Sequence, residues 1–268
     1  MCVYIRGVLW ESKQEDVLQQ VSSWSRKFDE PKSSEAQPLL VFPHAGSGAS
    51  AYRGMSAAFS EHFDVTVLQY PGRQDRMSEP LPSSVEEIAE GALADLLAHP
   101  ITDRPLTVFG HSMGAAVAFE FVRRAEVAGM SISLLMVSAA VAPSRAAGKP
   151  SHPTDDEEIL AHLKSLEGTD SGVFGDADLM RMALPVIKGD YRAFDAYTSD
   201  ESATISAPIA VIGGDSDPIV SIPDLYAWNR HSPKCQVTVF AGGHFFLYSA
   251  AEEVSRLLAD SALEVGRV

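Results

Sequence analysis

The sequence predicts an α/β protein whose central sheet is mostly parallel and carries helices on both faces. Short, fully apolar runs alternate with stretches whose apolar residues recur at helical spacing. Strands that are buried on both faces have continuous apolar runs of this kind. The composition agrees, because 46% hydrophobic and 21% charged residues are typical of a globular protein. A length of 268 residues suits one large domain with an insertion.

The regular part of the pattern begins at Pro38. Its apolar runs predict strands at residues 39–42, 65–68, 106–109, 133–138, 209–212 and 236–240. The helical stretches after these strands cover residues 51–61, 85–96, 112–128 and 254–261. Residues 38–145 and 203–268 are therefore expected to form one core around a single sheet.

Two regions lie outside this pattern. Residues 1–37 form an N-terminal extension, in which apolar spacing predicts an amphipathic helix over 14–28 that packs against the core. A polar linker over 31–37 follows it. Residues 146–202 contain no convincing strand and include two helical patterns, at 155–166 and 179–197. An insertion near the carboxyl ends of sheet strands is where a helical lid is expected.

The charge and the cysteines limit the possible partners and location. A net charge of −15 argues against nucleic acid or an anionic membrane as the main partner. No apolar run is long enough to span a membrane, and the N-terminus does not resemble a signal peptide. Cys2 and Cys235 show neither metal-ligand nor disulfide spacing. We expect a cytoplasmic protein without a metal site.

The candidate nucleophile is Ser112. Residues 110–114 read Gly-His-Ser-Met-Gly, directly after a predicted strand and before a predicted helix. In that context the G-x-S-x-G pattern places a serine on a sharp turn with its hydroxyl exposed. Gly110 and Gly114 remove side chains that would clash where strand and helix approach each other. The positive end of the helix then faces any oxyanion that forms nearby.

A serine needs a base, and His244 is the best candidate. It lies in a Gly-rich turn, residues 241–247, after an apolar strand and before the last helix. In serine hydrolases of this class the base follows the nucleophile and the acid along the chain. His111 adjoins the serine but is expected to point elsewhere. Polar or helical surroundings predict a surface position for His62, His99, His152, His162 and His231.

Two aspartates compete for the role of the acid that orients the base. Asp215 and Asp217 both lie in the turn after strand 209–212. We prefer Asp217, because it lies three residues after Gly214 and because Pro218 favours an extended backbone at the preceding residue. Asp215 would then shape the turn.

An oxyanion hole needs two backbone N–H groups. One is expected from Met113, the residue after the nucleophile, and the other from Ala45, in the loop after the first core strand. His44 and Phe245, which neighbour these catalytic positions in the sequence, are expected to contact the substrate.

Four segments taken together resemble the type II thioesterases, stand-alone α/β-hydrolases that accompany polyketide synthases and nonribosomal peptide synthetases. They are residues 42–46 (Phe-Pro-His-Ala-Gly), 69–73 (Gln-Tyr-Pro-Gly-Arg, with Arg76), 110–114, and 243–247 (Gly-His-Phe-Phe-Leu). Asp217 falls between the last two. The resemblance runs from about Pro38 to the C-terminus. It departs from the family at Ser47, where members often have a second glycine, and residues 1–37 match nothing in it.

The resemblance implies an α/β-hydrolase fold with a helical lid, and an activity. Members hydrolyse acyl groups from the phosphopantetheine arm of an acyl or peptidyl carrier protein, which clears stalled or mis-primed chains. No further cofactor is implied, and we expect a monomer. The lid would cover an acyl channel, with Leu160, Leu163, Leu166, Val173, Phe174, Met180, Met182 and Leu184 as its candidate lining. A basic patch at Arg73 and Arg76, or at Arg123 and Arg124, would help to dock an acidic carrier.

Other functions are consistent with the same residues. A serine esterase or lipase would act on free oxygen esters or acyl-CoA, and its rates on esters and thioesters would distinguish it. A thioesterase that releases or cyclises a finished product is a second alternative. The stand-alone editing type is favoured because the chain starts with its own methionine and ends soon after its last helix. A non-catalytic protein that binds a synthase is a third, which the complete candidate triad disfavours.

Overall fold

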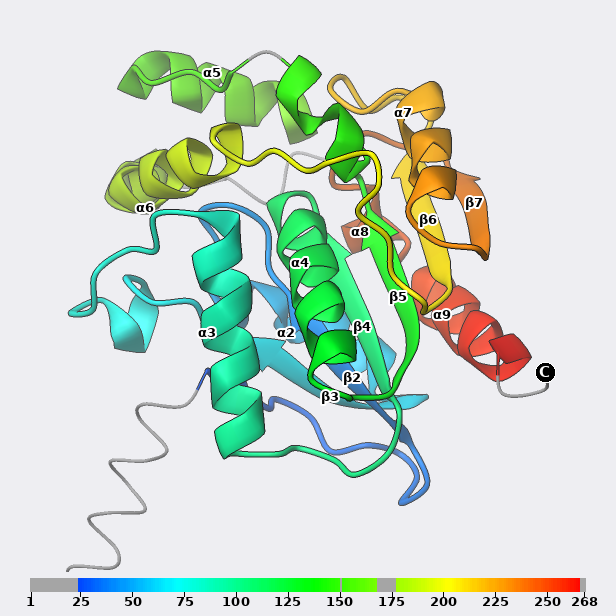
Figure 1. Ribbon diagram of the computed structural model, residues 1–268. Coiled ribbons are helices and arrows are strands. Elements are labelled where there is room, and N and C mark those ends of the chain that lie inside the picture. Colours follow the sequence, from blue (N-terminus) through cyan, green and yellow to red (C-terminus); the bar gives the residue numbers. More distant parts are fainter. Residues whose placement is uncertain (1–23, 150, 168–176, 266–268) are drawn as a thin grey trace, which may run out of the picture.

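The computed structural model describes residues 24–149, 151–167 and 177–265 (Figure 1). One seven-stranded sheet has the order β1-β3-β2-β4-β5-β6-β7. Its strands are β1 (Ser25–Arg26), β2 (Gln37–Phe42), β3 (Phe63–Leu68), β4 (Leu106–His111), β5 (Ile132–Ser138), β6 (Ile209–Gly214) and β7 (Cys235–Phe240). Neighbouring strands from β3 to β7 are parallel, and β1 pairs antiparallel with β3. The mostly parallel sheet predicted from the apolar runs is confirmed.

Helices cover both faces of the sheet (Figure 1). One face carries α3 (Val85–Ala98) and α4 (Met113–Val127), and the other carries α2 (Arg53–Phe59) and α9 (Ala251–Val265). Shorter helical segments are η1 (Ala49–Tyr52), η2 (Gln74–Arg76), η3 (Pro143–Gly148), α7 (Ile222–Tyr226), η4 (Ala227–Arg230) and α8 (Phe246–Ser249).

Strand β2 shows why the apolar runs are continuous. Leu40 and Phe42 pack in the cluster under α3 and α4, whereas Leu39 and Val41 pack in the cluster under α2 and α9. All four side chains are buried. Successive side chains of a strand point to opposite faces, so a strand covered by helices on both faces needs apolar residues at every position.

The helix predicted over 14–28 is wrong at its described end, and residues 14–23 lie outside the described residues. Ser25 and Arg26 form the edge strand β1 instead. A helix would place Trp24 and Phe28 on one side, but they pack in the clusters on opposite faces of the sheet. Pairing with β3 and burial of both rings outweigh the local helical spacing.

The insertion forms two helices, α5 (Asp156–Glu167) and α6 (Ala177–Asp195), beyond the carboxyl ends of the parallel strands (Figure 1). They pack on each other and on the loop after β7 in a separate apolar cluster. Its buried members are Ile159, Leu163, Leu166, Leu184, Ile187, Tyr191 and Phe245. The lid helices therefore rest on the loops at this edge of the sheet.

Candidate active site

Ser112 lies at the sharp turn between β4 and α4. Its backbone has φ 55° and ψ −124°, a conformation that is unusual for a residue with a side chain and that costs free energy. The Ser112 N–H donates to the carbonyl oxygen of Ser138 at the end of β5 (2.8 Å). This bond holds the strained turn against the sheet and leaves the hydroxyl at its outer side.

Gly114 lets the loop after β2 approach this turn closely. A Cβ at Gly114 would lie closer than 3.0 Å to the carbonyl oxygens of Phe42 and Pro43. Backbone atoms cannot swing away as side chains can. The small residue in the G-x-S-x-G pattern is therefore required by a neighbouring segment some 70 residues earlier in the chain, as well as by the turn itself.

The structure brings Ser112, His244 and Asp217 together in one hydrogen-bonded series. His244 Nε2 lies 2.9 Å from Ser112 Oγ, and His244 Nδ1 lies 2.8 Å from Asp217 Oδ2. The side chains of His244 and Asp217 are almost fully buried. The carboxylate orients the imidazole, so that its other nitrogen can accept the serine proton.

The two candidate acids have different partners. Asp217 Oδ1 accepts the N–H groups of Ile219 (2.9 Å) and Val220 (3.1 Å), which leaves Oδ2 for the histidine. Asp215 is exposed, and its Oδ1 accepts the N–H of Gly242 (3.0 Å) in the loop before His244. Asp215 thus joins the loops after β6 and β7, and only Asp217 of the two contacts the imidazole.

From His44 to Ser47 in the loop after β2, only one backbone N–H group has no hydrogen-bond partner among the described residues. The N–H of His44 donates to Tyr52 Oη (3.1 Å), that of Gly46 to Asp190 Oδ2 (2.7 Å) and that of Ser47 to the His44 carbonyl (3.2 Å). The Ala45 N–H has no hydrogen-bond partner within the described part of the chain. Met113 is the first residue of α4, where no helical carbonyl can reach its N–H. Both donors named from the sequence are therefore open to a ligand.

Three histidines and Phe245 lie in contact behind the nucleophile. The ring of His111 is 5.3 Å from that of His244 and 5.7 Å from that of His44, and Phe245 packs against all three. Burial lowers the pKa of His44 to about 3 and holds the pKa of His111 well below its usual value, with the neighbouring imidazoles adding to both effects. His44 and His111 are therefore neutral at ordinary pH.

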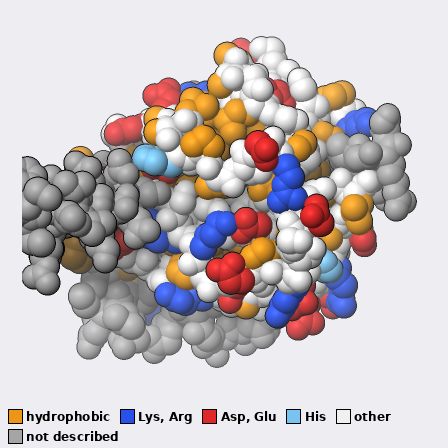
Figure 2. Space-filling model, turned by 90° about the horizontal axis from the view of Figure 1, so that it is seen from below, with side chains coloured by type: hydrophobic (Ala, Val, Ile, Leu, Met, Phe, Trp, Pro, Cys, Tyr) orange, Lys and Arg blue, Asp and Glu red, His pale blue; other side chains and the backbone are white. Residues whose placement is uncertain are grey.

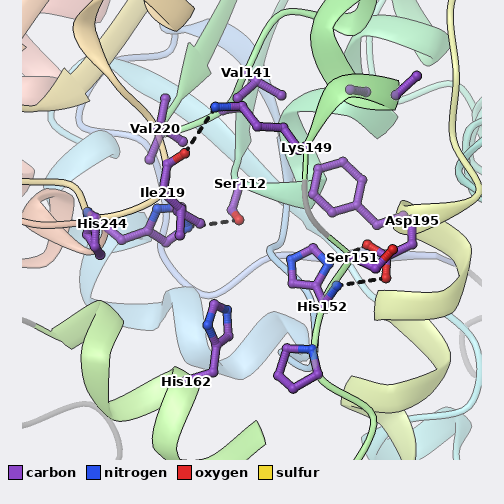
Figure 3. A pocket seen from close by; sticks show the side chains of 17 residues that line it. Ser112, Val141, Lys149, Ser151, His152, His162, Asp195, Ile219, Val220 and His244 are labelled. Atoms are coloured by element: carbon purple, nitrogen blue, oxygen red, sulfur yellow. Dashed lines mark hydrogen bonds and ion pairs between the residues drawn. The ribbon is translucent and has the colours of Figure 1, made fainter. Parts of the chain in front are cut away.

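A cavity of about 560 Å³ opens from the serine (Figure 3). Ser112 and His244 lie at one side, and His152 with Asp195 lies across from His244. Much of the wall is small or apolar, including Ala139, Ala140, Val141, Ala146, Ala147, Pro153, Phe194, Pro218, Ile219 and Val220. The polar exceptions include a close pair, His152 Nδ1 and Asp195 Oδ1, 2.5 Å apart. The cavity combines a nucleophile with a mostly apolar wall, as an acyl-binding site requires.

Comparison with known proteins identifies the family. A family model described as thioesterase domain matches residues 37–261. The chain belongs to the thioesterase family. This thioesterase is 39% identical over 242 residues to the probable cadicidin biosynthesis thioesterase of Streptomyces griseus, a match that covers 89% of this chain and 65% of that protein. It is 37% identical over 243 residues to the thioesterase PikA5 of Streptomyces venezuelae, covering 90% of this chain and 85% of the relative.

A solved structure supports the same assignment. The type II thioesterase BorB from the borrelidin biosynthetic cluster is 39% identical to this thioesterase, with a TM-score of 0.81, and the match covers 89% of this chain and 97% of that one. The resemblance to type II thioesterases and the α/β-hydrolase fold predicted from the sequence are confirmed.

The residues expected to contact the acyl chain are mostly not those that line the cavity. Leu163, Leu166 and Leu184 belong to the cluster that holds α5 and α6 together, and Leu160 packs against it. These four side chains pack within the lid, and their contact with an acyl chain stays a prediction. Val173 and Phe174, and the side chains of Met180 and Met182, lie outside the described residues. His44 and Phe245 pack beside the triad and do not line the cavity.

Three histidines of the thioesterase are not on the surface as expected. His62 and His99 are exposed, but His152 and His162 line the cavity. His231 is fully buried, with Nδ1 2.7 Å from the Ala203 carbonyl oxygen. Polar neighbours in the sequence mislead here, because the insertion folds back over the sheet edge and covers its own polar segments. His152 stacks on Tyr191 of α6 at 4.1 Å.

The arginines proposed as a carrier-binding patch are committed elsewhere. Arg73 is buried against Asp190, and Arg76 is buried against Glu79. Arg123 and Arg124 both pair with Glu120. On the face seen in Figure 2, basic and acidic side chains are intermingled as well. Arg73 and Arg76 are too buried to form an exposed patch, whereas a patch at the partly exposed Arg123 and Arg124 stays a prediction.

Within residues 24–149, 151–167 and 177–265, no group of three or more His, Cys, Asp or Glu side chains is arranged to hold a metal ion. None of the helices described in these ranges is both long and apolar enough to cross a membrane.

Proposed function

We propose that this thioesterase hydrolyses acyl groups from the phosphopantetheine arm of an acyl or peptidyl carrier protein through a Ser112–His244–Asp217 triad. The observation that carries the proposal is the hydrogen-bonded series from Asp217 through His244 to Ser112. The names of two relatives support the substrate class, because one is a cadicidin biosynthesis thioesterase and the other a type II thioesterase from the borrelidin biosynthetic cluster.

In this mechanism His244 Nε2 takes the proton of Ser112 Oγ as the oxygen attacks the thioester carbonyl. The N–H groups of Ala45 and Met113 bind the oxyanion of the tetrahedral intermediate. His244 then gives its proton to the leaving pantetheine thiol, and an acyl-serine remains. Water, deprotonated by His244, attacks this ester, and His244 returns the proton to Ser112 Oγ as the acid is released. Asp217 stabilises the imidazolium that forms in both halves of the reaction.

The neutral histidines help this cycle. Because His111 and His44 bind protons only at low pH, His244 can accept a proton without a charged His111 at 5.3 Å or a charged His44 next to His111. His44 also holds the loop that carries Ala45, since its Nδ1 lies 2.8 Å from Tyr52 Oη. We therefore propose that His44 positions the loop that carries Ala45. Phe245, which packs beside the triad and in the apolar cluster of the lid helices, would connect the two.

The carrier protein is the proposed partner, the cytoplasm the proposed compartment, and the monomer the proposed state. The sparse cysteines support a reducing compartment. Size-exclusion chromatography with light scattering tests the monomer, and a second species at micromolar concentration would overturn it.

Release of acyl groups from a loaded carrier protein tests the function directly. The purified chain is mixed with butyryl-carrier protein, with butyryl-pantetheine and with a matched oxygen ester, and the free acid is measured. We expect hydrolysis of both thioesters at a higher kcat/KM than the ester, and loss of release in Ser112→Ala with an unchanged melting temperature. A preference for the ester would favour the esterase alternative. Full activity of Ser112→Ala would refute the triad.

A further inference from the structure

A buried carboxylate on the lid helix contacts the loop that carries the candidate oxyanion donor. Asp190 of α6 accepts the Gly46 N–H through Oδ2 at 2.7 Å. The same carboxylate forms a two-pronged ion pair with Arg73, with Nη1–Oδ2 at 2.7 Å and Nη2–Oδ1 at 2.8 Å. These partners lie 144 and 117 positions away in the sequence.

The ion pair between Asp190 and Arg73 is buried, and its effect is better explained by orientation than by added stability. The side chain of Asp190 is 1% exposed and that of Arg73 is 4% exposed. Desolvation of two charges offsets most of their attraction, so a buried ion pair is weak evidence for added stability. Two parallel hydrogen bonds from an arginine do, however, fix the orientation of a carboxylate. In this orientation Oδ2 points at the Gly46 N–H.

Arg73 also contacts the loop after β2, directly at Ser47 and through Gln69 at Ala49. Its Nη1 also donates to the Ser47 carbonyl (3.3 Å), and its own carbonyl accepts from Gln69 Nε2 (2.9 Å). The other end of that amide, Gln69 Oε1, accepts the Ala49 N–H (2.7 Å). The segment 46–49 is thus bonded at three points to side chains outside it. A loop without regular secondary structure depends on such contacts for a single conformation.

The helix also touches the loop by packing. Gly46 has φ 78°, and a Cβ at this position would collide with the Ile187 side chain of α6. Helix α6 therefore lies directly on the Gly46 backbone. The peptide between Ala45 and Gly46 is held by the bond to Asp190 and by this contact, and the preceding His44 is held by Tyr52. The N–H groups of His44 and Gly46 are both hydrogen-bonded, and the Ala45 N–H between them has no partner among the described residues.

We infer that Asp190, oriented by Arg73, is a positioning residue that sets the direction of the Ala45 N–H toward the oxyanion. Helix α6 is then part of the catalytic machinery as well as a cover of the cavity. The inference rests on the proposed function, because Ala45 matters in this way only if an oxyanion forms at Ser112. It identifies the Gly46–Asp190 hydrogen bond, and not the charge of the pair, as the catalytically important contact.

Two matched double variants separate the hydrogen bond from the charge. Arg73→Met with Asp190→Asn removes both charges but keeps a side-chain oxygen for the Gly46 N–H. Arg73→Met with Asp190→Leu removes both charges and the acceptor, in a side chain of the same shape. Rates are measured on butyryl-pantetheine and p-nitrophenyl butyrate, per active site titrated with a fluorophosphonate. The affinity for a trifluoromethyl ketone, which forms a tetrahedral oxyanion on serine, is measured in parallel.

We expect kcat of the asparagine pair to fall by less than about tenfold, because the acceptor for the Gly46 N–H remains although Arg73 no longer orients it. In the leucine pair we expect kcat to fall about tenfold to a hundredfold, with KM changed less than about twofold and ketone affinity reduced by a similar factor, as for a misplaced oxyanion donor. Equal kcat in the two pairs would overturn the inference. So would a fall in kcat without a fall in ketone affinity.

Two further results keep the test decisive. If the leucine pair does not fold, Asp190→Asn alone is compared with the unsubstituted chain, because it also keeps the acceptor. A folded Asp190→Asn that loses more than about tenfold in kcat would contradict the inference. If the unsubstituted chain binds the ketone but hydrolyses no thioester, the proposed function fails, and the ketone affinities of the variants still decide the role of Asp190.

Discussion

In the proposed mechanism the turn at Ser112 and the loop that carries Ala45 contribute to the same reacting centre, yet different parts of the chain shape them. The turn at Ser112, with its strained φ of 55°, lies between consecutive elements, and its only distant partners named here are backbone atoms of β5 and of the loop after β2. The loop from His44 to Ala49 has one local turn bond, from the Ser47 N–H to the His44 carbonyl, and distant side chains hold the rest, among them Asp190, Arg73 and Gln69. The first is a local structure, and the second depends on the lid.

This difference predicts how each region responds to change. A substitution in the turn at Ser112 should cause a large loss of kcat or of the free energy of unfolding. A substitution in the loop from His44 to Ala49 should lower kcat by a smaller factor, because several separate hydrogen bonds hold the loop. The following experiments test this comparison, from the largest expected effect to the smallest.

The triad gives the largest effect. Asp217→Asn should lower kcat about ten-thousandfold, because an amide would hold His244 in the wrong tautomer. Asp215→Asn, in the same turn but bonded to Gly242 instead of the imidazole, should cost less than about tenfold. Steady-state rates on butyryl-pantetheine measure both. Similar losses in the two variants would mean that Asp217 has no special role.

Gly114→Ala should be the most damaging glycine substitution for folding. The new methyl group would meet two backbone carbonyls of the loop after β2, which cannot turn aside. We expect the free energy of unfolding to fall by about 3 kcal/mol or more, measured by urea denaturation. Gly54→Ala in α2 is the control. Its Cβ would have no neighbour within 4 Å, so stability should rise by about 0.5 kcal/mol. Near-normal stability of Gly114→Ala would mean that the turn tolerates a wider approach.

Gly46→Ala tests the contact between lid and loop. The residue must adopt a positive φ, and its methyl group would push against Ile187. We expect kcat to fall about tenfold with a smaller change in KM, because the Ala45 donor is displaced by a fraction of an ångström. Adding Ile187→Ala should restore part of the loss, since it removes the colliding side chain. If the second substitution worsens kcat instead, the collision is not the cause.

The smallest effect concerns pH. Burial keeps the pKa of His44 at about 3 in the folded chain, against about 6.5 when unfolded. Between these pH values the unfolded chain binds a proton at this residue and the folded chain does not. The free energy of unfolding is therefore highest above about pH 7 and decreases as the pH falls. From pH 7.5 to 5.5, we expect the free energy of unfolding to fall by about 1 kcal/mol less in His44→Gln than in the unsubstituted chain, measured by urea denaturation.

His62→Gln is the matched control for the pH experiment. His62 is exposed, so its removal should leave the pH dependence of stability unchanged. If the slope in His44→Gln equals that in His62→Gln, His44 is not held neutral by burial.

Parts of the site could be predicted because their signals are local. The pattern around Ser112 needs only a strand, a turn and a helix, and the Gly-rich turn before His244 is visible in the same way. The choice between Asp215 and Asp217 is harder, since both lie in one turn and only the structure shows that Asp217 is hydrogen-bonded to the imidazole. The predicted helix at the N-terminus failed because apolar spacing alone does not show that Trp24 and Phe28 face opposite sides of the sheet.

Other parts had no local signal. Asp190 lies in an amphipathic helix, where an aspartate is ordinarily a surface residue, and nothing nearby in the sequence indicates burial. Arg73 stood out as part of a family motif, but its acidic partner did not. His152 read as a surface histidine although it lines the cavity opposite His244.

The sequence by itself determined the mostly parallel sheet, the thioesterase family and the order of the residues expected in the triad. These features follow from short-range sterics and from the burial of apolar residues at regular spacing, which one segment can express alone. The tertiary structure decided the lining of the cavity, the burial of Arg73 and the contact of Asp190 with Gly46. Those depend on hydrogen bonds and packing between residues more than a hundred positions apart, which exist only once the lid helices rest on the sheet edge.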